Sequence, residues 1–112
     1  MIYRDFQDVK LSALGMGAMR LPVVDGDDSK IDEAAAFAMV DEAMARGVNY
    51  YDTAWVYHGG NSELAIGRAL AAYPRDKFYL ANKFPGYDLG NMGKVQEIFE
   101  EQLKKCLSLI HI

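Results

Sequence analysis

The sequence predicts an α/β fold in which parallel strands alternate with helices. Short apolar segments bounded by glycine or proline alternate with longer segments of helical period along the 112 residues. Each strand–helix repeat takes roughly 30–35 residues, the size of a βαβ unit. The composition, 51% hydrophobic and 25% charged, is that of a globular protein. Two architectures satisfy this pattern, a doubly wound sheet and a (β/α)₈ barrel.

The chain is expected to open with a short polar hairpin within residues 1–11, where apolar and charged side chains alternate loosely. The first buried strand is expected at 14–19, a run of apolar and small residues. Pro22 ends this strand because proline has no backbone N–H to donate. The polar cluster at 25–29 predicts a turn before the first helix.

The first helix is expected to begin near Asp32 and to end at Arg46. Acidic residues lie at its start, where the helix dipole favours negative charge, and Gly47 follows its last turn. The apolar stripe at helical spacing consists of Ala36, Phe37, Val40 and Met44.

The second strand is expected at 48–52, which is rich in aromatic and β-branched residues. A loop over 53–60 follows, after which Asn61 or Ser62 is expected to cap the second helix. Pro74 ends that helix. Its core-facing positions are Leu64, Ile66, Leu70 and Tyr73.

The third strand is expected at 77–83, and a loop that starts at Pro85 runs to about Asn91. The third helix completes the third strand–helix unit. Its apolar stripe consists of Val95, Ile98, Phe99, Leu103 and Cys106.

Composition excludes several kinds of partner. Twelve basic and sixteen acidic residues give a net charge of −4, so we expect no nucleic-acid partner. The longest wholly apolar run, 34–40, is far shorter than the ~20 residues of a membrane span. The first residues lack the apolar core of a signal peptide, and Cys106 as the single cysteine excludes an internal disulfide. These observations predict a cytoplasmic protein.

Charged residues end two neighbouring strands of the predicted sheet. Both candidate architectures bind ligands at the carboxyl ends of their strands. Asp52 ends the second strand and Lys83 the third, and neighbouring strands lie about 4.8 Å apart. A partly buried carboxylate persists only when it is paired, so we expect an ion pair between them.

Tyr57 lies five residues beyond Asp52 in the following loop. A nearby ammonium favours loss of the phenolic proton, so a tyrosine beside Lys83 suits general acid catalysis of carbonyl reduction. Each residue also has a simpler interpretation when taken alone. Asp52 can cap a turn, Lys83 can be a solvated strand-end lysine, and His58 can be an ordinary loop residue.

Other binding motifs are incomplete in this sequence. The segment 15–20 begins like a dinucleotide-binding fingerprint, but Arg20 stands in place of its third glycine and no helix begins there. The cluster from Asp25 lacks the glycine and the terminal glutamate of a calcium loop. Cys106 fits a core position, and ligands for a zinc site are missing, so we expect no metal.

The segments around these residues resemble the N-terminal part of the aldo-keto reductase family. The resemblance rests on Asp52-Thr53-Ala54, the loop tyrosine Tyr57, and the run 61–70 with its Ser-Glu and Gly-x-x-Leu. The opening 14–22 and the segment 82–84 fit as well. The resemblance covers residues 1–106 and implies the first three units of a (β/α)₈ TIM barrel, preceded by an N-terminal hairpin.

The resemblance implies a reductase of aldehydes or ketones that uses a nicotinamide cofactor, usually NADPH, with NADH as the alternative. Asp52, Tyr57 and Lys83 match three members of the family's Asp-Tyr-Lys-His tetrad. In that role Tyr57 donates the proton, Lys83 assists it and Asp52 holds Lys83. The residues beside the cofactor would be Gly17, Ala18, Met19 and Asp52.

The loop 58–60 is similar to a bacterial branch in which some members carry an iron–sulfur cluster in a C-terminal domain, beyond this segment. The tail 107–112 departs from the family's pattern. His111 imitates the family's histidine but follows Cys106 too closely, so it is not assigned to catalysis and the tail is interpreted as an artefact. With three of eight units, the segment alone is expected to be marginally stable and inactive.

Two alternatives remain open beside the enzyme. A barrel of this family can serve as a nicotinamide-binding regulatory subunit without catalysis, and the chain can be a truncated reading frame without a function of its own. The sequence leaves the carbonyl substrate and the oligomeric state undetermined.

Overall fold

A three-stranded parallel sheet forms the centre of the computed structural model, which describes residues 1–107. Its order is β3 (Met16–Gly17), β4 (Tyr50–Asp52) and β5 (Tyr79–Ala81). Asp52 pairs in register with Gly17 on one side and with Ala81 on the other. The interpretation of His111 and most of the tail lies outside the described residues.

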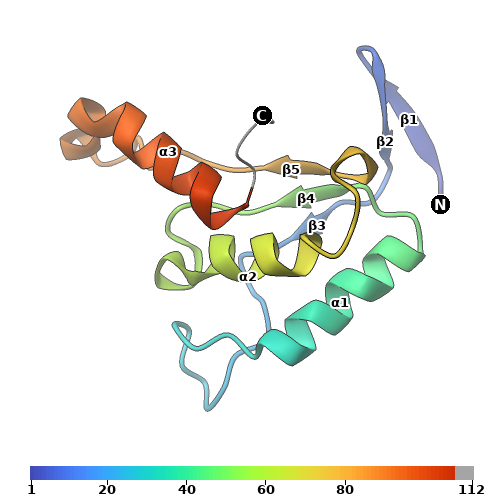
Figure 1. The fold of residues 1–112 in the computed structure, drawn as a ribbon, viewed down its shortest axis with the longest axis horizontal. Helices are drawn as coiled ribbons and strands as arrows, with labels where there is room; N and C mark the ends of the chain where they lie inside the picture. The colour runs from blue at the N-terminus through green and yellow to red at the C-terminus, as the bar shows by residue number, and fades with distance from the viewer. Residues whose placement is uncertain (108–112) are drawn as a thin grey trace.

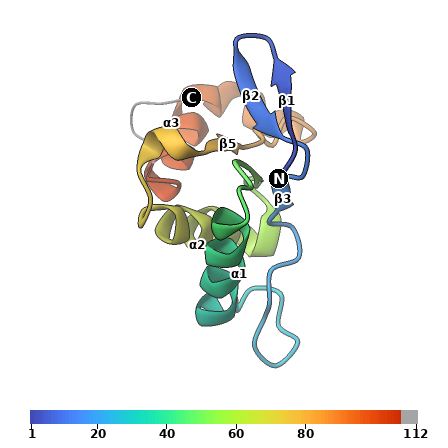
Figure 2. The same cartoon turned by 90° about the vertical axis from the view of Figure 1, so that its right-hand side faces the viewer.

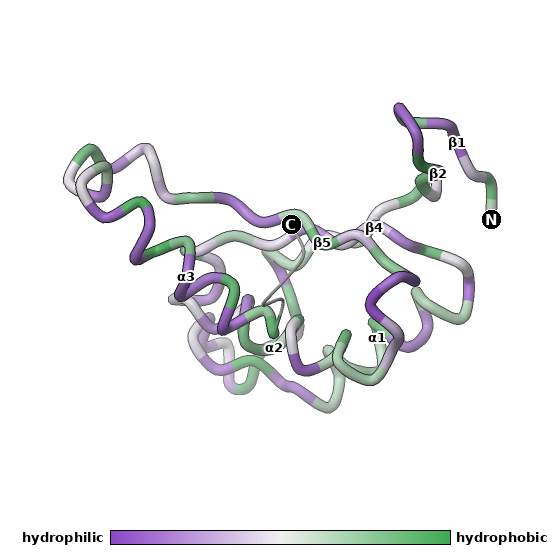
Figure 3. The backbone as a smooth tube through the Cα atoms, turned by 45° about the horizontal axis from the view of Figure 1, so that its top comes forward, coloured by the Kyte–Doolittle hydropathy of each residue, from purple (hydrophilic) through white to green (hydrophobic). Residues whose placement is uncertain are grey.

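The three helices cover one face of this sheet, as Figures 1 and 3 show. They are α1 (Glu33–Ala45), α2 (Asn61–Leu70) and α3 (Val95–Lys105). The core lies between the helices and the sheet, and the aromatic ring of Tyr51 on β4 is fully buried there. Alternation along β4 therefore sends its two neighbours, Tyr50 and Asp52, to the opposite face.

The N-terminal hairpin is present and projects from one end of the sheet (Figure 2). It consists of β1 (Tyr3–Phe6) and β2 (Val9–Ser12), which pair antiparallel. Asn49 attaches it to the start of β4, because its Oδ1 accepts from the N–H of Ser12 at 2.7 Å and its backbone N–H donates to Ser12 Oγ at 3.0 Å. The hairpin thus lies at the amino end of the strands, away from Asp52.

The strands are shorter than the sequence predicts because their ends belong to turns. Val48 donates its N–H to Ala43 O and so belongs to the turn that follows α1. Lys77 lies in a 3₁₀ turn, η2 (Arg75–Lys77), and donates to Pro74 O. The predicted loops also contain two 3₁₀ turns, η1 (Tyr57–Gly60) and η3 (Leu89–Lys94).

The predicted start of α1 near Asp32 is confirmed, whereas the predicted cap of α2 is wrong. Asp32 caps α1 by accepting from the N–H of Ala35 at 3.1 Å. Neither Asn61 nor Ser62 caps α2, which begins at Asn61 with Gly60 as its N-cap. Their side chains bond elsewhere, Asn61 Nδ2 to Ser29 O at 2.8 Å and Ser62 Oγ to Ala18 O at 3.0 Å.

The apolar stripe of α3 is buried only in part. Ile98 and Cys106 are buried against the rest of the chain, whereas Val95 is 47% exposed and Phe99 40% exposed. Purple and green segments alternate along α3 in Figure 3. Within residues 1–107, the side of α3 that carries Val95 and Phe99 is therefore only partly covered.

Candidate active site

The ends of β4 and β5 bring an aspartate and a lysine together. Asp52 pairs with Ala81, and Lys83 lies two residues beyond Ala81, so both side chains belong to the sheet face opposite the helices. Lys83 Nζ donates to Asp52 Oδ2 at 2.5 Å and to the backbone oxygen of Thr53 at 3.0 Å. The ion pair that the strand ends predict is present.

Tyr57 joins this pair from the loop after β4. Lys83 Nζ lies 5.0 Å from the centroid of the Tyr57 ring, within the range of a cation–π contact. The loop turns back through three consecutive residues of positive φ, which are His58, Gly59 and Gly60. This turn returns the chain toward the sheet and leaves the tyrosine ring beside the lysine.

The surroundings of Lys83 favour its charged form. Partial burial alone would lower the pKa of Lys83, but hydrogen bonds to Asp52 and Tyr57 and their charges outweigh it, so the pKa of Lys83 is raised above its usual value. The side chain is an ammonium at neutral pH. It therefore places a fixed positive charge beside the hydroxyl-bearing ring of Tyr57.

The segment at the end of β3 and just after it, residues 17–19, leaves open space next to Asp52 and brings no charged side chain to it. Gly17 lies next to Asp52 in the sheet, and a Cβ added there would meet nothing within 4 Å. Met19 is 55% exposed. Ala18 is buried, and its N–H and C=O are already bonded to Asp52 O and Ser62 Oγ. Gly17 thus leaves open space next to Asp52, and the exposed side chain of Met19 follows two residues later.

His58 has a structural position. It is 2% exposed, and its Nε2 accepts the N–H of Leu21 at 3.0 Å. Its Nδ1 lies 2.8 Å from the backbone oxygen of Asp28 and donates to it. An imidazole with one accepting and one donating nitrogen is neutral. His58 therefore ties η1 to the segment that precedes α1.

A buried polar cluster behind Lys83 escapes the sequence analysis. Glu63 is fully buried, and its carboxylate accepts from Asn82 Nδ2 at 2.7 Å and lies 3.4 Å from Lys105 Nζ. The helix dipole alone accounts for an acidic residue in the first turn of α2, so the position of Glu63 does not by itself indicate that the side chain is buried. The missed signal is its spacing, three and seven residues before the core residues Ile66 and Leu70.

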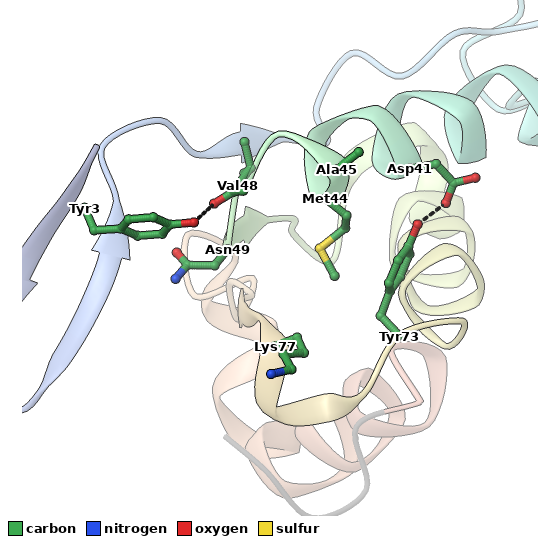
Figure 4. Close-up of a pocket in the computed structure, with 9 residues that line it drawn as sticks. Tyr3, Asp41, Met44, Ala45, Val48, Asn49, Tyr73 and Lys77 are labelled. Carbon is green, nitrogen blue, oxygen red and sulfur yellow. Dashed lines mark hydrogen bonds between the residues drawn. The ribbon is translucent and has the colours of Figure 1, made fainter. Parts of the chain in front are cut away.

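A hollow lies at the amino end of the strands, beside the hairpin and opposite the Asp52–Lys83 pair (Figure 4). Its volume is about 420 Å³. The hydroxyl of Tyr73 donates to Asp41 at 2.5 Å and the hydroxyl of Tyr3 donates to Gly47 O at 2.9 Å. These hydrogen bonds hold the hairpin, α1 and the segment after α2 together, so we interpret the hollow as a junction between these elements and not as a ligand site.

Metal and membrane features are missing from the described part of the chain. Among residues 1–107, no group of three or more His, Cys, Asp or Glu side chains is arranged to hold a metal ion. No helix in the same range combines the length and the apolar character that crossing a bilayer requires.

Comparison with known proteins finds a family model, similar sequences and similar solved structures. The model of the aldo/keto reductase family matches residues 13–108. Over 78 residues the chain is 35% identical to "Probable aldo-keto reductase 1" of Glycine max, and over 79 residues it is 34% identical to the "NADH-specific methylglyoxal reductase" of Escherichia coli K12. Among solved structures, the holo form of aldo-keto reductase AKR11C1 from Bacillus halodurans matches with a TM-score of 0.73 at 27% identity.

The matches cover most of this chain but a minor part of each relative. The two curated relatives align with 70% and 68% of the chain, which spans 22% and 23% of their own lengths. The solved structure covers 96% of the chain, which corresponds to 37% of that protein. The fold is therefore that of the first three strand–helix units of a (β/α)₈ barrel, preceded by its hairpin.

Proposed function

The chain belongs to the aldo/keto reductase family, and we propose that the protein containing it reduces the carbonyl group of an aldehyde or ketone. The observation that carries this proposal is the contact of Lys83 with both Asp52 and Tyr57 at the carboxyl edge of the sheet. Carbonyl reduction needs a proton donor beside the carbonyl oxygen, and a tyrosine next to a fixed ammonium supplies one.

Each residue has a distinct part in the proposed reaction. Tyr57 donates its phenolic proton to the carbonyl oxygen, and the ammonium of Lys83 stabilises the phenolate that remains. Asp52 orients Lys83 through the 2.5 Å hydrogen bond and balances its charge. A bound nicotinamide cofactor supplies the hydride for the carbonyl carbon.

The open surface at Gly17 and Met19, next to Asp52, is where we propose that the nicotinamide end of the cofactor binds. Ala18 shapes this surface through the course of its backbone. We propose NADPH as the preferred cofactor, with NADH as the competing choice because one relative is described as NADH-specific. Parallel turnover assays with the two cofactors decide between them.

The decisive test is Tyr57→Phe in a full-length protein that carries this segment. Loss of the proton donor is expected to lower kcat/KM for carbonyl reduction by roughly 10²–10⁴-fold, a typical contribution of general acid catalysis. Binding of the reduced cofactor, followed by fluorescence, should be unchanged because the ring remains.

Tyr87→Phe is the matched control, because Tyr87 is 74% exposed and lies outside the Asp52–Lys83–Tyr57 cluster. It should reduce carbonyls at the wild-type rate. Turnover at the wild-type rate in Tyr57→Phe would contradict the proposed mechanism.

A further inference from the structure

The backbone of Lys83 is held on both sides by side chains. Its N–H donates to Oδ1 of Asn82 at 2.8 Å, and its C=O accepts from Nε2 of Gln102 at 2.8 Å. Gln102 belongs to α3 and is buried. The direction in which the lysine side chain leaves β5 thus depends on two amide groups.

Asn82 can hold Lys83 only in one orientation of its own amide. Its Nδ2 donates to Oε2 of Glu63 at 2.7 Å. A carboxylate only accepts hydrogen bonds, so it selects the orientation in which Asn82 presents its NH₂ group to Glu63. Oδ1 then faces the N–H of Lys83, where an acceptor is required.

Lys105 neutralises Glu63 and connects the same cluster to the tyrosine loop. The Glu63 side chain is 0% exposed, and Lys105 Nζ lies 3.4 Å from its Oε1, so the buried carboxylate has a cationic partner. The same ammonium lies 4.2 Å from the centroid of the Trp55 ring and 3.5 Å from Gly60 O. These two contacts lie on either side of Tyr57 in the chain.

We propose that Glu63 is a positioning residue for the reaction, acting on Lys83 through Asn82 and on the Tyr57 loop through Lys105. This inference rests on the proposed function of Lys83 and Tyr57 and adds what sets the geometry between them. Glu63 is bonded to Asn82 and Lys105, so its effect reaches Lys83 and the Tyr57 loop through the backbone groups that these two side chains hold.

The isosteric change Glu63→Gln in the full-length protein tests this inference. A glutamine can present either its oxygen or its NH₂ group to Asn82, so the amide of Asn82 loses its single orientation. Because a displacement of about 1 Å in a catalytic group costs up to 10²-fold in rate, we expect kcat to fall roughly 10–100-fold. KM for the carbonyl and the Kd of the cofactor should stay within about twofold, and the limb of the kcat–pH profile that reports the proton donor should move.

A thermodynamic cycle with Asn82→Ala separates positioning from simple loss of stability. If Glu63 acts on Lys83 through Asn82, the double variant should be no slower than the slower single variant, and both single variants should displace the same limb of the pH profile. Glu33→Gln is the matched control, because Glu33 pairs with Arg68 on the surface between α1 and α2. It should leave kcat and the pH profile unchanged.

The outcomes separate the positioning role of Glu63 from the proposed function itself. A wild-type rate and pH profile in Glu63→Gln, alongside an inactive Tyr57→Phe, overturns the positioning role and leaves the proposed function intact. A wild-type protein without carbonyl reduction overturns the proposed function and the inference with it. Should Glu63→Gln fail to fold, Asn82→Ala decides, and an unchanged pH profile there overturns the inference.

Discussion

Two buried residues outside the reaction, Tyr51 and Cys106, have strongly raised pKa values. Burial, followed by the charge of Tyr73, raises the pKa of Tyr51 to about 12. Burial, followed by the charge of Glu63, raises the pKa of Cys106 to about 12. Both groups are therefore neutral in the folded chain at every pH below that range.

These shifts predict a loss of stability in alkaline solution. From pH 9.0 for the thiol and 10.0 for the phenol, the unfolded chain releases protons that the folded chain retains up to about pH 12. The folded state then binds more protons, so the free energy of unfolding falls as pH rises, by up to about 1.4 kcal/mol per pH unit and group. The temperature at the midpoint of thermal unfolding of the full-length protein should decrease as the pH is raised from 8 to 10.5.

Cys106→Ala is the control for this prediction. It should remove the part of the decline that begins near pH 9.0 and keep the part due to Tyr51. An equal decline in the variant and the wild type would show that Cys106 is not the group responsible.

At the scale of elements, the contact between α2 and the end of α3 holds the polar cluster together. Gly67 lies on α2, and a Cβ at this position would overlap the backbone oxygen of Lys105 and lie 2.9 Å from the backbone of Cys106. The two helices approach backbone to backbone here. This approach also brings Lys105 and Gln102 to Glu63 and Lys83.

Gly67→Ala is expected to push α3 away from α2. Because backbone atoms cannot move aside as a flexible side chain does, the free energy of unfolding should fall by about 1–3 kcal/mol, the usual cost of overpacking. Chemical denaturation of the full-length protein measures this loss. Gly93→Ala is the matched control, since a Cβ there meets nothing within 4 Å, and equal stability of the two variants would contradict the prediction.

At the scale of the whole molecule, both edges of the sheet and one of its faces are uncovered within residues 1–107. The strands β3 and β5 each have one neighbour in the sheet. An apolar groove of about 690 Å³ lies along β3 and α1, lined by Leu14, Met16 and Met39 among others. In a closed (β/α)₈ barrel the last strand–helix unit packs against the first, so this groove is where we expect it to dock.

Residues 1–112 expressed alone are therefore expected to associate and to lack carbonyl reductase activity. Unpaired parallel edges and exposed apolar side chains favour association between copies. Light scattering after size-exclusion chromatography should detect species larger than 12.5 kDa. A monomer that unfolds cooperatively, or one that turns over an aldehyde with NADPH, would contradict this expectation. The full-length protein under the same conditions is the control.

The amino-acid sequence by itself determined the features that depend on neighbours along the chain. Periodicity placed three strand–helix units and the hairpin, and the acidic residues at 32–33 marked the start of α1 because the helix dipole favours negative charge there. The meeting of Asp52 with Lys83 also followed from the sequence, because parallel strands end at the same edge of a sheet.

Only the tertiary structure decided which polar side chains are buried and with whom. Ser62 bonds Ala18 O across 44 positions instead of capping its helix, and His58 is buried against Leu21 and Asp28. Glu63 reaches Lys105 across 42 positions. A buried polar group must find a hydrogen-bond partner wherever the packed chain supplies one. Local pattern carries no information about such distant partners, because they are set by the packing of α2 and α3 against the sheet.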